Sequence, residues 1–281
     1  MKYLIKICLL YLFLFPSKTT AQELIPYKII GTDSLFLEVY QGSQITTSQA
    51  SPAMVFFFGG GWNTGSRQQF AMHAQYFSQK GITCFLADYR TKTTHNTRPE
   101  ECVRDAKSAM RFIRKNAQQL GIDPEKIIAS GGSAGGHLAA ATSLIAGFNE
   151  ETDDLSISPN ANALVLFNPV IDNGPGGYGF ERVGEFYKDF SPLHNITTGA
   201  PPTLLLLGTK DHLIPVTTVE YYKTVMEKVK SECVLKIYEN GKHGFFNYNK
   251  NKPYFFQNTL YDTEAFLRKQ GYIQADFLHQ K

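Results

Sequence analysis

The chain has 281 residues, of which 43% are hydrophobic, 13% aromatic and 19% charged. This length suits one large domain, and the aromatic and hydrophobic content excludes a disordered or collagen-like chain. No apolar run reaches the ~18 residues that a membrane-spanning helix needs, so we expect no integral membrane span.

The first 21 residues differ in composition from the rest. Lys2 and Lys6 precede an apolar stretch over residues 7–15, and the small residue Ala21 follows a polar end. This three-part order predicts a signal peptide over residues 1–21, with export to the periplasm or out of the cell, and a single mature domain over residues 22–281. A short hydrophobic first strand is the alternative interpretation.

Removing residues 1–21 changes the charge balance. The basic residues fall from 28 to 25 and then equal the 25 acidic residues, so the formal net charge falls from +3 to zero. A neutral mature chain argues against nucleic-acid binding. Three cysteines remain, Cys84, Cys102 and Cys233. At least one of them is a free thiol, and spacing alone does not decide whether two of them pair.

The mature chain alternates predicted strands and helices. Strands are expected over residues 27–31, 34–41, 53–58, 82–87, 126–130, 161–167, 203–207 and 233–238. Helices are expected over residues 67–79, 101–120, 134–146, 216–229 and 254–269. Asp123 followed by Pro124 is typical of a helix start. The alternation predicts an α/β fold, a mostly parallel sheet with helices on both faces and its strand ends along one edge.

Residues 131–136 read Gly-Gly-Ser-Ala-Gly-Gly between a predicted strand and a predicted helix. This is the context that a G-x-S-x-G nucleophile turn requires, because side chains beside the serine would collide in so sharp a turn. Ser133 is therefore the candidate nucleophile, and the N–H of Ala134 at the helix start is a candidate oxyanion donor. A glycine-rich packing turn or phosphate loop is the alternative, but the Gly-Lys-Ser/Thr of a P-loop is absent.

A glycine run, Gly59-Gly60-Gly61, follows the earlier buried strand and precedes Trp62. Consecutive glycines let backbone N–H groups turn toward an oxyanion, and lipases and esterases carry an HGGG motif at this position. Phe58 stands where that motif has histidine. The substitution alters how the loop is braced but leaves its backbone donors.

A serine hydroxyl needs a base, and the order nucleophile, acid, base narrows the choice. Of the seven histidines, His243 lies in a loop after the last predicted strand, whereas His137 is one turn beyond Ser133 and is expected to pack beneath it. Asp211 follows the strand at 203–207 and fits as the acid. Asp172, after the preceding strand, is a rival.

Taken together, these motifs resemble the α/β-hydrolase superfamily over nearly all of residues 24–270, most closely its esterase/lipase branch. That branch includes hormone-sensitive-lipase-like esterases and secreted acetyl and feruloyl esterases. The matching residues are Gly59-Gly60-Gly61-Trp62, Asp88-Tyr89-Arg90, residues 131–136, Asn168-Pro169, Ser191-Pro192, Asp211 and His243-Gly244-Phe245. The resemblance implies oxyanion donors from Gly60, Gly61 and Ala134.

Substrate choice is expected to depend on residues 171–200, a short glycine-rich and aromatic insertion near the strand ends. Tyr178 and Trp62 are candidate substrate-binding residues, although aromatics here also serve as plain anchors. The insertion is too short for a large lipase cap, which favours small acyl groups, such as acetyl on a carbohydrate or another small molecule. No metal-ligand spacing occurs, so neither a metal nor a cofactor is expected.

Two other functions are weighed against the esterase. A peptidase of the prolyl-oligopeptidase type has a similar nucleophile turn, but it usually carries a large propeller domain for which the chain has no room. A non-catalytic binding protein on a hydrolase fold usually loses a triad residue, whereas Ser133, Asp211 and His243 are all present.

Overall fold

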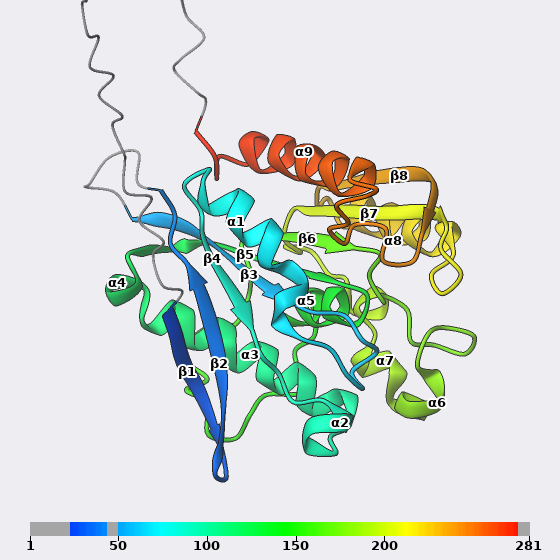
Figure 1. The fold of residues 1–281 in the computed structure, drawn as a ribbon. Coiled ribbons are helices and arrows are strands. Elements are labelled where there is room, and N and C mark those ends of the chain that lie inside the picture. The colour runs from blue at the N-terminus through cyan, green and yellow to red at the C-terminus, as the bar shows by residue number, and fades with distance from the viewer. Residues whose placement is uncertain (1–22, 44–49, 275–281) are drawn as a thin grey trace, which may run out of the picture.

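The computed structural model describes residues 23–43 and 50–274, and the predicted signal peptide lies outside them. In this part the chain forms an eight-stranded sheet with the order β1-β2-β4-β3-β5-β6-β7-β8 (Figure 1). The strands are β1 (Glu23–Ile30), β2 (Asp33–Tyr40), β3 (Ser51–Phe57), β4 (Thr83–Ala87), β5 (Ile122–Gly132), β6 (Ala163–Phe167), β7 (Thr203–Lys210) and β8 (Cys233–Lys242).

Helices connect these strands. The α-helices are α1 (Ala71–Ser78), α2 (Lys92–His95), α3 (Pro99–Lys115), α4 (Ala117–Leu120), α5 (Ala134–Leu144), α6 (Phe180–Val183), α7 (Tyr187–Phe190), α8 (Val216–Lys228) and α9 (Tyr254–Lys269). The 3₁₀ turns are η1 (Arg67–Phe70), η2 (Gly184–Phe186) and η3 (Pro192–Asn195).

Six neighbouring strands, from β4 and β3 across to β8, are parallel, and an antiparallel hairpin of β1 and β2 extends the sheet beside β4. The predicted mostly parallel α/β fold is confirmed. Because parallel strands end at the same edge of a sheet, the segments that follow β3, β5, β7 and β8 meet there.

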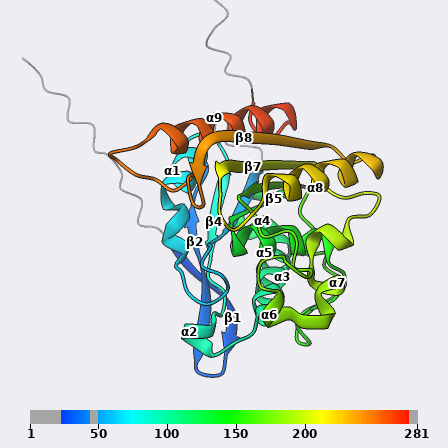
Figure 2. The ribbon, with the colours of Figure 1, turned by 90° about the vertical axis from the view of Figure 1, so that its right-hand side faces the viewer.

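Side chains along the central strands point alternately to the two faces of the sheet, which divides the core into two layers. In β3, Val55 and Phe57 belong to the cluster covered by α3, α5 and α8, whereas Met54 and Phe56 belong to the cluster covered by α1 and α9. Successive side chains of a strand point to opposite faces, so a strand that is apolar at every position is buried on both. Figure 2 shows the two helical layers on either side of the sheet.

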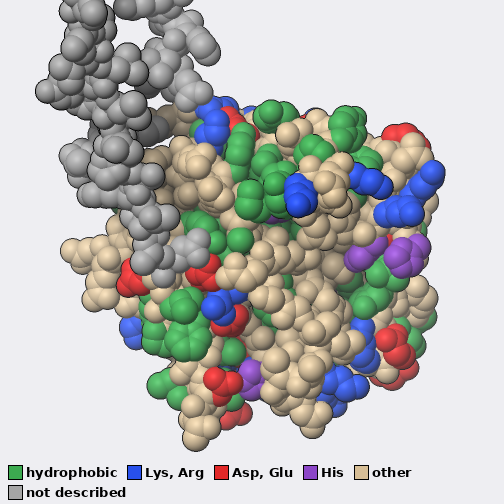
Figure 3. All heavy atoms as spheres, in the orientation of Figure 1, with side chains coloured by type: hydrophobic (Ala, Val, Ile, Leu, Met, Phe, Trp, Pro, Cys, Tyr) green, Lys and Arg blue, Asp and Glu red, His purple; other side chains and the backbone are tan. Residues whose placement is uncertain are grey.

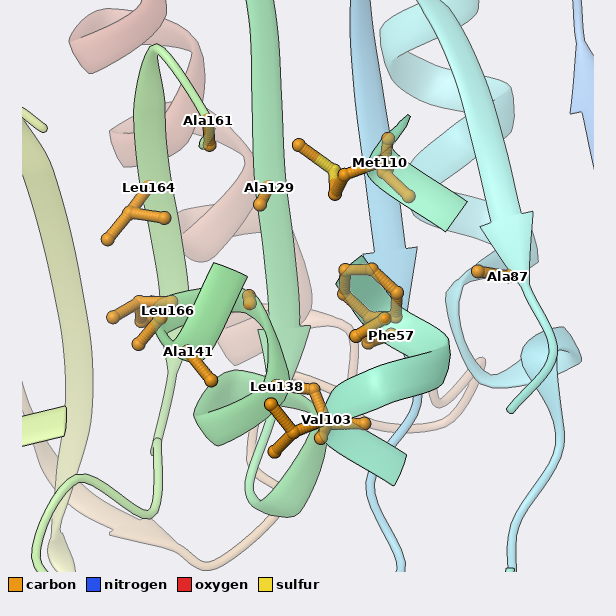
Figure 4. Packing of buried hydrophobic residues seen from close by; sticks show 14 of the residues in the cluster. Phe57, Ala87, Val103, Met110, Ala129, Leu138, Ala141, Ala161, Leu164 and Leu166 are labelled. Atoms are coloured by element: carbon orange, nitrogen blue, oxygen red, sulfur yellow. The ribbon is translucent and has the colours of Figure 1, made fainter. Parts of the chain in front are cut away.

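The packing of the first layer can be followed in Figure 4. Val103 and Met110 of α3 and Leu138 of α5 lie against strand residues that include Phe57 and Ala129. All five side chains are fully buried. The helix that begins beside Ser133 is thus fixed to the sheet by its apolar face.

The interpretation of Asp123-Pro124 as a helix start is wrong. Both residues lie in β5, in a bulge between the pairs Ser51–Ile122 and Ala53–Ile127. The Asp123 carboxylate accepts the Glu125 N–H at 2.9 Å, so the local turn uses the same side chain that would cap a helix. Proline has no N–H to donate, and a bulge is where a strand tolerates it.

The helix expected over residues 101–120 is interrupted. It divides at Asn116 into α3 and α4. Gly121 follows the last residue of α4 in a left-handed conformation (φ 66°), and its N–H donates to the carbonyls of Ala117 and Gln118. The three cysteines are buried and free. None of the helices in residues 23–43 and 50–274 combines the length and the apolar character needed to cross a membrane.

Candidate active site

Ser133, Asp211 and His243 occupy equivalent places in the fold. Each is the first residue after a parallel strand: Ser133 after β5, Asp211 after β7 and His243 after β8. Their side chains come from segments up to 110 residues apart and meet at the carboxyl edge of the sheet. The topology alone therefore brings together the three groups that the sequence singled out.

The three side chains form one hydrogen-bonded chain. Nε2 of His243 lies 2.9 Å from Oγ of Ser133, and Nδ1 of His243 lies 2.8 Å from Oδ2 of Asp211. The ring therefore carries its proton on Nδ1, toward the carboxylate, and presents the Nε2 lone pair to the hydroxyl. This is the geometry in which a histidine removes a proton from serine.

The backbone of Ser133 is strained, with φ 54° and ψ −121°. Hydrogen bonds on both sides hold it: its N–H donates to the Phe167 carbonyl at 2.9 Å, and its carbonyl accepts the Val170 N–H at 3.1 Å. A Cβ at Gly131 would overlap the Gly135 carbonyl, and a Cβ at Gly135 would overlap the carbonyl of Phe57. The flanking glycines are thus required by close backbone contact.

Asp211 is held as a carboxylate. Its Oδ1 accepts the N–H groups of Leu213 and Ile214 at 2.9 and 3.0 Å, and its side chain is fully buried. Burial by itself raises the pKa of Asp211, but the hydrogen bonds from His243 and the two N–H groups outweigh it and hold the pKa below its usual value. The rival acid, Asp172, instead contacts the Gly174 N–H and lies 4.0 Å from His194.

The glycine run after β3 lies beside the serine. A Cβ on Gly59 would come within 3.3 Å of the Ser133 Cβ. The Gly59 N–H donates to Oε1 of Gln69 at 2.6 Å, and the Gly60 carbonyl accepts the Asn63 N–H at 3.1 Å. Among the described residues, the N–H groups of Gly60 and Gly61 have no acceptor. Ala134 is the first residue of α5, and its N–H has no partner one turn earlier.

Phe58 replaces the histidine of the HGGG motif, and its surroundings explain how the loop is braced without it. Its ring stacks on Tyr89 with the centroids 4.0 Å apart, and the Tyr89 hydroxyl donates to the Phe58 carbonyl at 2.7 Å. Asp88 and Arg90 on either side make ion pairs with Arg67 and Asp105. The Asp-Tyr-Arg segment after β4 therefore supports the glycine loop after β3.

Comparisons with known proteins identify the family of this chain. The BD-FAE family model matches residues 37–175, and that of the dienelactone hydrolase family matches residues 160–270. A solved structure of Thermogutta terrifontis esterase 2 phosphorylated by paraoxon is 38% identical in sequence, with a TM-score of 0.86. That alignment covers 93% of this chain and 99% of the esterase. The chain belongs to the esterase branch of the α/β-hydrolase superfamily.

Curated relatives of this hydrolase are also named as esterases. Esterase LipC of Mycobacterium tuberculosis is 29% identical over 69% of this chain, and the acetylxylan esterase of Xylanibacter ruminicola is 28% identical over 69%. The alignments cover 52% and 41% of those two proteins. The hydrolase thus spans about half the length of the curated relatives it matches.

Three further residues of the hydrolase support the site and were not singled out for that role from the sequence. Asn168, the first residue after β6, has its Nδ2 3.4 and 3.5 Å from the two ring nitrogens of His243. Gln69 holds Gly59, as described above. Arg182 of α6 donates to the Gly61 carbonyl. Only Asn168 carries a sequence signal, because it follows a predicted strand as the triad residues do.

The predicted insertion over residues 171–200 folds into α6, η2, α7 and η3 (Figure 1). Its Phe190 is fully buried, stacks on His137 at 4.3 Å and accepts a hydrogen bond from Nε2 of that ring at 3.0 Å. Burial lowers the pKa of His137 to about 3, with the bond to Phe190 opposing it. His137 therefore anchors the insertion beneath the nucleophile turn, as expected.

Trp62 and Tyr178, the candidate substrate-binding residues, lie together at the glycine loop after β3. Their rings are 5.9 Å apart, and the Arg182 guanidinium lies 5.0 Å from the Trp62 ring and 5.3 Å from the Tyr178 ring. The Tyr178 hydroxyl is within 2.6 Å of where a Cβ on Gly61 would be. Trp62 is 1% exposed, so most of its indole serves packing. Tyr178 is half-buried and covers the loop.

A cavity of about 420 Å³ lies beside the loop that follows His243. Its walls include Phe245, Tyr248 and Phe255 together with the amides of Asn247 and Asn249. Aromatic faces flanked by amide groups are suited to a polar ring such as a sugar. No group of three or more His, Cys, Asp or Glu side chains in the described ranges is placed to hold a metal ion.

Proposed function

We propose that the protein is a serine carboxylesterase in which Ser133 is the nucleophile, His243 the general base and Asp211 the residue that orients the base. The observation that carries this proposal is the unbroken hydrogen-bonded chain, 2.9 and 2.8 Å long at its two links. Membership of an esterase branch supports the same chemistry.

In the proposed mechanism, Nε2 of His243 takes the proton of Ser133 as Oγ attacks the ester carbonyl. The imidazolium that forms is stabilised by the Asp211 carboxylate on its other side. Collapse of the tetrahedral intermediate returns that proton to the departing alcohol. A water molecule then repeats the sequence on the acyl-enzyme and releases the acid.

The oxyanion of each intermediate requires donors on the side of Ser133 away from His243. We assign this role to the N–H groups of Gly60, Gly61 and Ala134. Support comes from the absence of any other acceptor for Gly60 and Gly61 in the described residues and from the position of Ala134 at a helix N-terminus. Preorganised donors of this kind contribute about 10²–10³ in kcat each.

The proposed substrates are short acyl esters, most specifically acetyl groups on carbohydrates. The short insertion and the contact of the Tyr178 hydroxyl with Gly61 support a preference for small acyl groups. Structures of the Thermogutta terrifontis relative have propionate and butyrate bound, and a curated relative is an acetylxylan esterase. The aromatic and amide-lined cavity beside His243 supports a sugar as the alcohol.

Export is part of the proposal and rests on residues 1–21 alone. If these residues are a signal peptide, the mature protein begins at Gln22. Intact-mass measurement of protein recovered from outside the cytoplasm tests this directly, and a mass that retains the first 21 residues contradicts it.

The experiment for the activity is a substrate panel assayed with the wild type and Ser133→Ala. We expect hydrolysis of acetylated and butyrylated 4-nitrophenyl and sugar esters, slower hydrolysis of octanoyl esters, and loss of about 10⁶-fold in kcat in Ser133→Ala. Equal turnover of acetyl and octanoyl esters contradicts the acyl preference. Faster cleavage of an aminoacyl naphthylamide than of any ester assigns a peptidase instead.

A further inference from the structure

A second cavity, of about 170 Å³, adjoins the oxyanion loop on the side of α2 and α6. Its walls are Trp62 and Asn63 of the loop, Lys92 of α2, the chain from Asn96 to Pro99, and Arg182. A water molecule occupies ~30 Å³ in the liquid, so the cavity has room for several polar heavy atoms. Nothing in the proposed triad chemistry uses this cavity.

The lining of this cavity is positively charged. It contains Lys92, Arg98 and Arg182 and no Asp or Glu. Arg182 pairs at 3.2 Å with Glu181, whose side chain is 73% exposed, where such a pair contributes little. Arg98 pairs at 3.0 Å with Glu100, which lies outside the lining and is 15% exposed. Lys92 makes no ion pair within the described part of the chain.

The wider surface does not share this excess of positive charge. Figure 3 shows Lys and Arg side chains interspersed with Asp and Glu side chains over the visible face. The predicted mature chain is formally neutral. The cationic lining is therefore a local feature of the cavity.

Two polar atoms of the lining residues are buried without a hydrogen-bond partner among the described residues. They are Nε1 of Trp62 and Oγ1 of Thr97. An indole N–H is only a donor, and a hydroxyl donates one hydrogen bond, so both groups are left without the acceptor that buried polar atoms normally have. The three cations that line this cavity favour an anionic group rich in acceptor oxygens.

The cavity is directly connected to the reaction site through the backbone. Trp62 follows Gly61, so the wall begins about 3.8 Å, one Cα step, from a proposed oxyanion donor. The Lys92 N–H donates to the Trp62 carbonyl at 3.0 Å, which fixes α2 to the same loop. The cavity wall therefore begins at the residue next to a proposed oxyanion donor.

We propose that this cavity binds a carboxylate carried by the substrate, such as that of a hexuronate sugar bearing or adjoining the acylated hydroxyl. The proposal rests on the esterase function above and adds a charge requirement to it. A carboxylate supplies two acceptor oxygens for the cations of the lining. Its binding adds to the affinity and specificity for acidic esters while the triad chemistry stays the same.

The test compares an O-acetylated methyl glucuronoside with its uncharged carboxyl methyl ester, with 4-nitrophenyl acetate as a third substrate. In the wild type at low salt we expect kcat/KM for the free acid to exceed that for the methyl ester at least fivefold, and the ratio to fall as salt is added. In Lys92→Gln, which keeps the backbone bond to Trp62, the ratio falls at least threefold. Lys228→Gln on exposed α8 removes the same charge elsewhere and leaves the ratio unchanged.

Two results overturn the proposal: a wild type without preference for the free acid, and a preference that Lys92→Gln leaves intact. If 4-nitrophenyl acetate is hydrolysed in those cases, the esterase function stands and only the carboxylate site is wrong. A wild type that hydrolyses none of the three esters contradicts the esterase function itself. Calorimetry with Ser133→Ala then tests the cavity alone, by tighter binding of glucuronate than of its methyl ester.

Discussion

The turn that carries Ser133 and the insertion that covers it are held by different kinds of contact. The turn is fixed by backbone against backbone, with no space for a Cβ at Gly131 or Gly135. The insertion is held by side chains, chiefly Phe190 against His137 and Arg182 against the oxyanion loop. The position of the nucleophile therefore tolerates almost no substitution at its flanking glycines, whereas the side chains of the insertion can vary and so can set the substrate.

The largest effect is expected where the chemistry depends on one carboxylate. Asp211→Asn keeps the shape of the site, but the amide N–H now donates to Nδ1 of His243. The neutral ring then carries its proton on Nε2, which faces Ser133 and can no longer accept the proton of the hydroxyl. We expect kcat for 4-nitrophenyl acetate to fall about 10⁴-fold. Asp172→Asn is the matched control, because that carboxylate lies near His194 and away from His243. Equal losses in the two variants contradict the assignment of Asp211.

The backbone packing of the turn is tested by Gly135→Ala. The new Cβ would overlap the carbonyl oxygens of Phe57 and Phe58, so we expect a loss of about 3 kcal/mol or more in the free energy of unfolding. Urea denaturation measures it. Gly147→Ala, where a Cβ meets nothing within 4 Å, is the control and should change stability by less than about 1 kcal/mol. A stable Gly135→Ala enzyme shows that the turn is less constrained than we infer.

The insertion is tested by Arg182→Ala. Loss of the bond to the Gly61 carbonyl and of the contacts with Trp62 and Tyr178 should lower kcat/KM for 4-nitrophenyl acetate about tenfold, or ~1.4 kcal/mol, while stability changes by less than ~1 kcal/mol. Lys188→Ala, on an exposed site of the same insertion, should leave both unchanged. A loss of stability without loss of activity makes Arg182 an anchor only.

The contact between His137, below the nucleophile turn, and Phe190 of the insertion is tested by the pH dependence of the free energy of unfolding. The pKa of His137 is about 3 in the folded chain, against about 6.5 in an unfolded one, so the unfolded state binds the extra proton between these values and stability falls as pH falls. His137→Leu should remove about 1.4 kcal/mol per pH unit from the slope of stability near pH 5. It should also lose stability at pH 7, because the Phe190 carbonyl loses its donor.

His73 is the control for that measurement. Burial also lowers its pKa to about 3, but neither ring nitrogen has a hydrogen-bond partner among the described residues. His73→Leu should therefore flatten the slope equally without the loss at pH 7. If both variants behave alike at pH 7, the contact between His137 and the insertion contributes nothing measurable.

The residues held by local backbone contacts could be predicted from the sequence, whereas those held by distant side-chain contacts could not. Ser133 and its glycines were predictable because the constraint is local, five residues in one turn. The sequence favours Asp211 as the acid and keeps Asp172 as a rival, because both follow predicted strands. The fold shows that Asp211 is the one that reaches His243. Gln69 and Arg182 bind the backbone of the glycine loop, at Gly59 and Gly61, from other segments of the chain. No local sequence pattern indicates either residue. Asp123 was wrongly assigned to a helix start, because its carboxylate accepts a nearby backbone N–H in the same way at a strand bulge as at a helix start.

The most direct test of the central claim is mass spectrometry of the protein after reaction with a fluorophosphonate. We expect one adduct per chain, on the peptide that contains Ser133, with labelling abolished in Ser133→Ala and strongly slowed in His243→Ala. Absence of an adduct on an enzyme that hydrolyses esters, or an adduct that persists on another residue in Ser133→Ala, would contradict it.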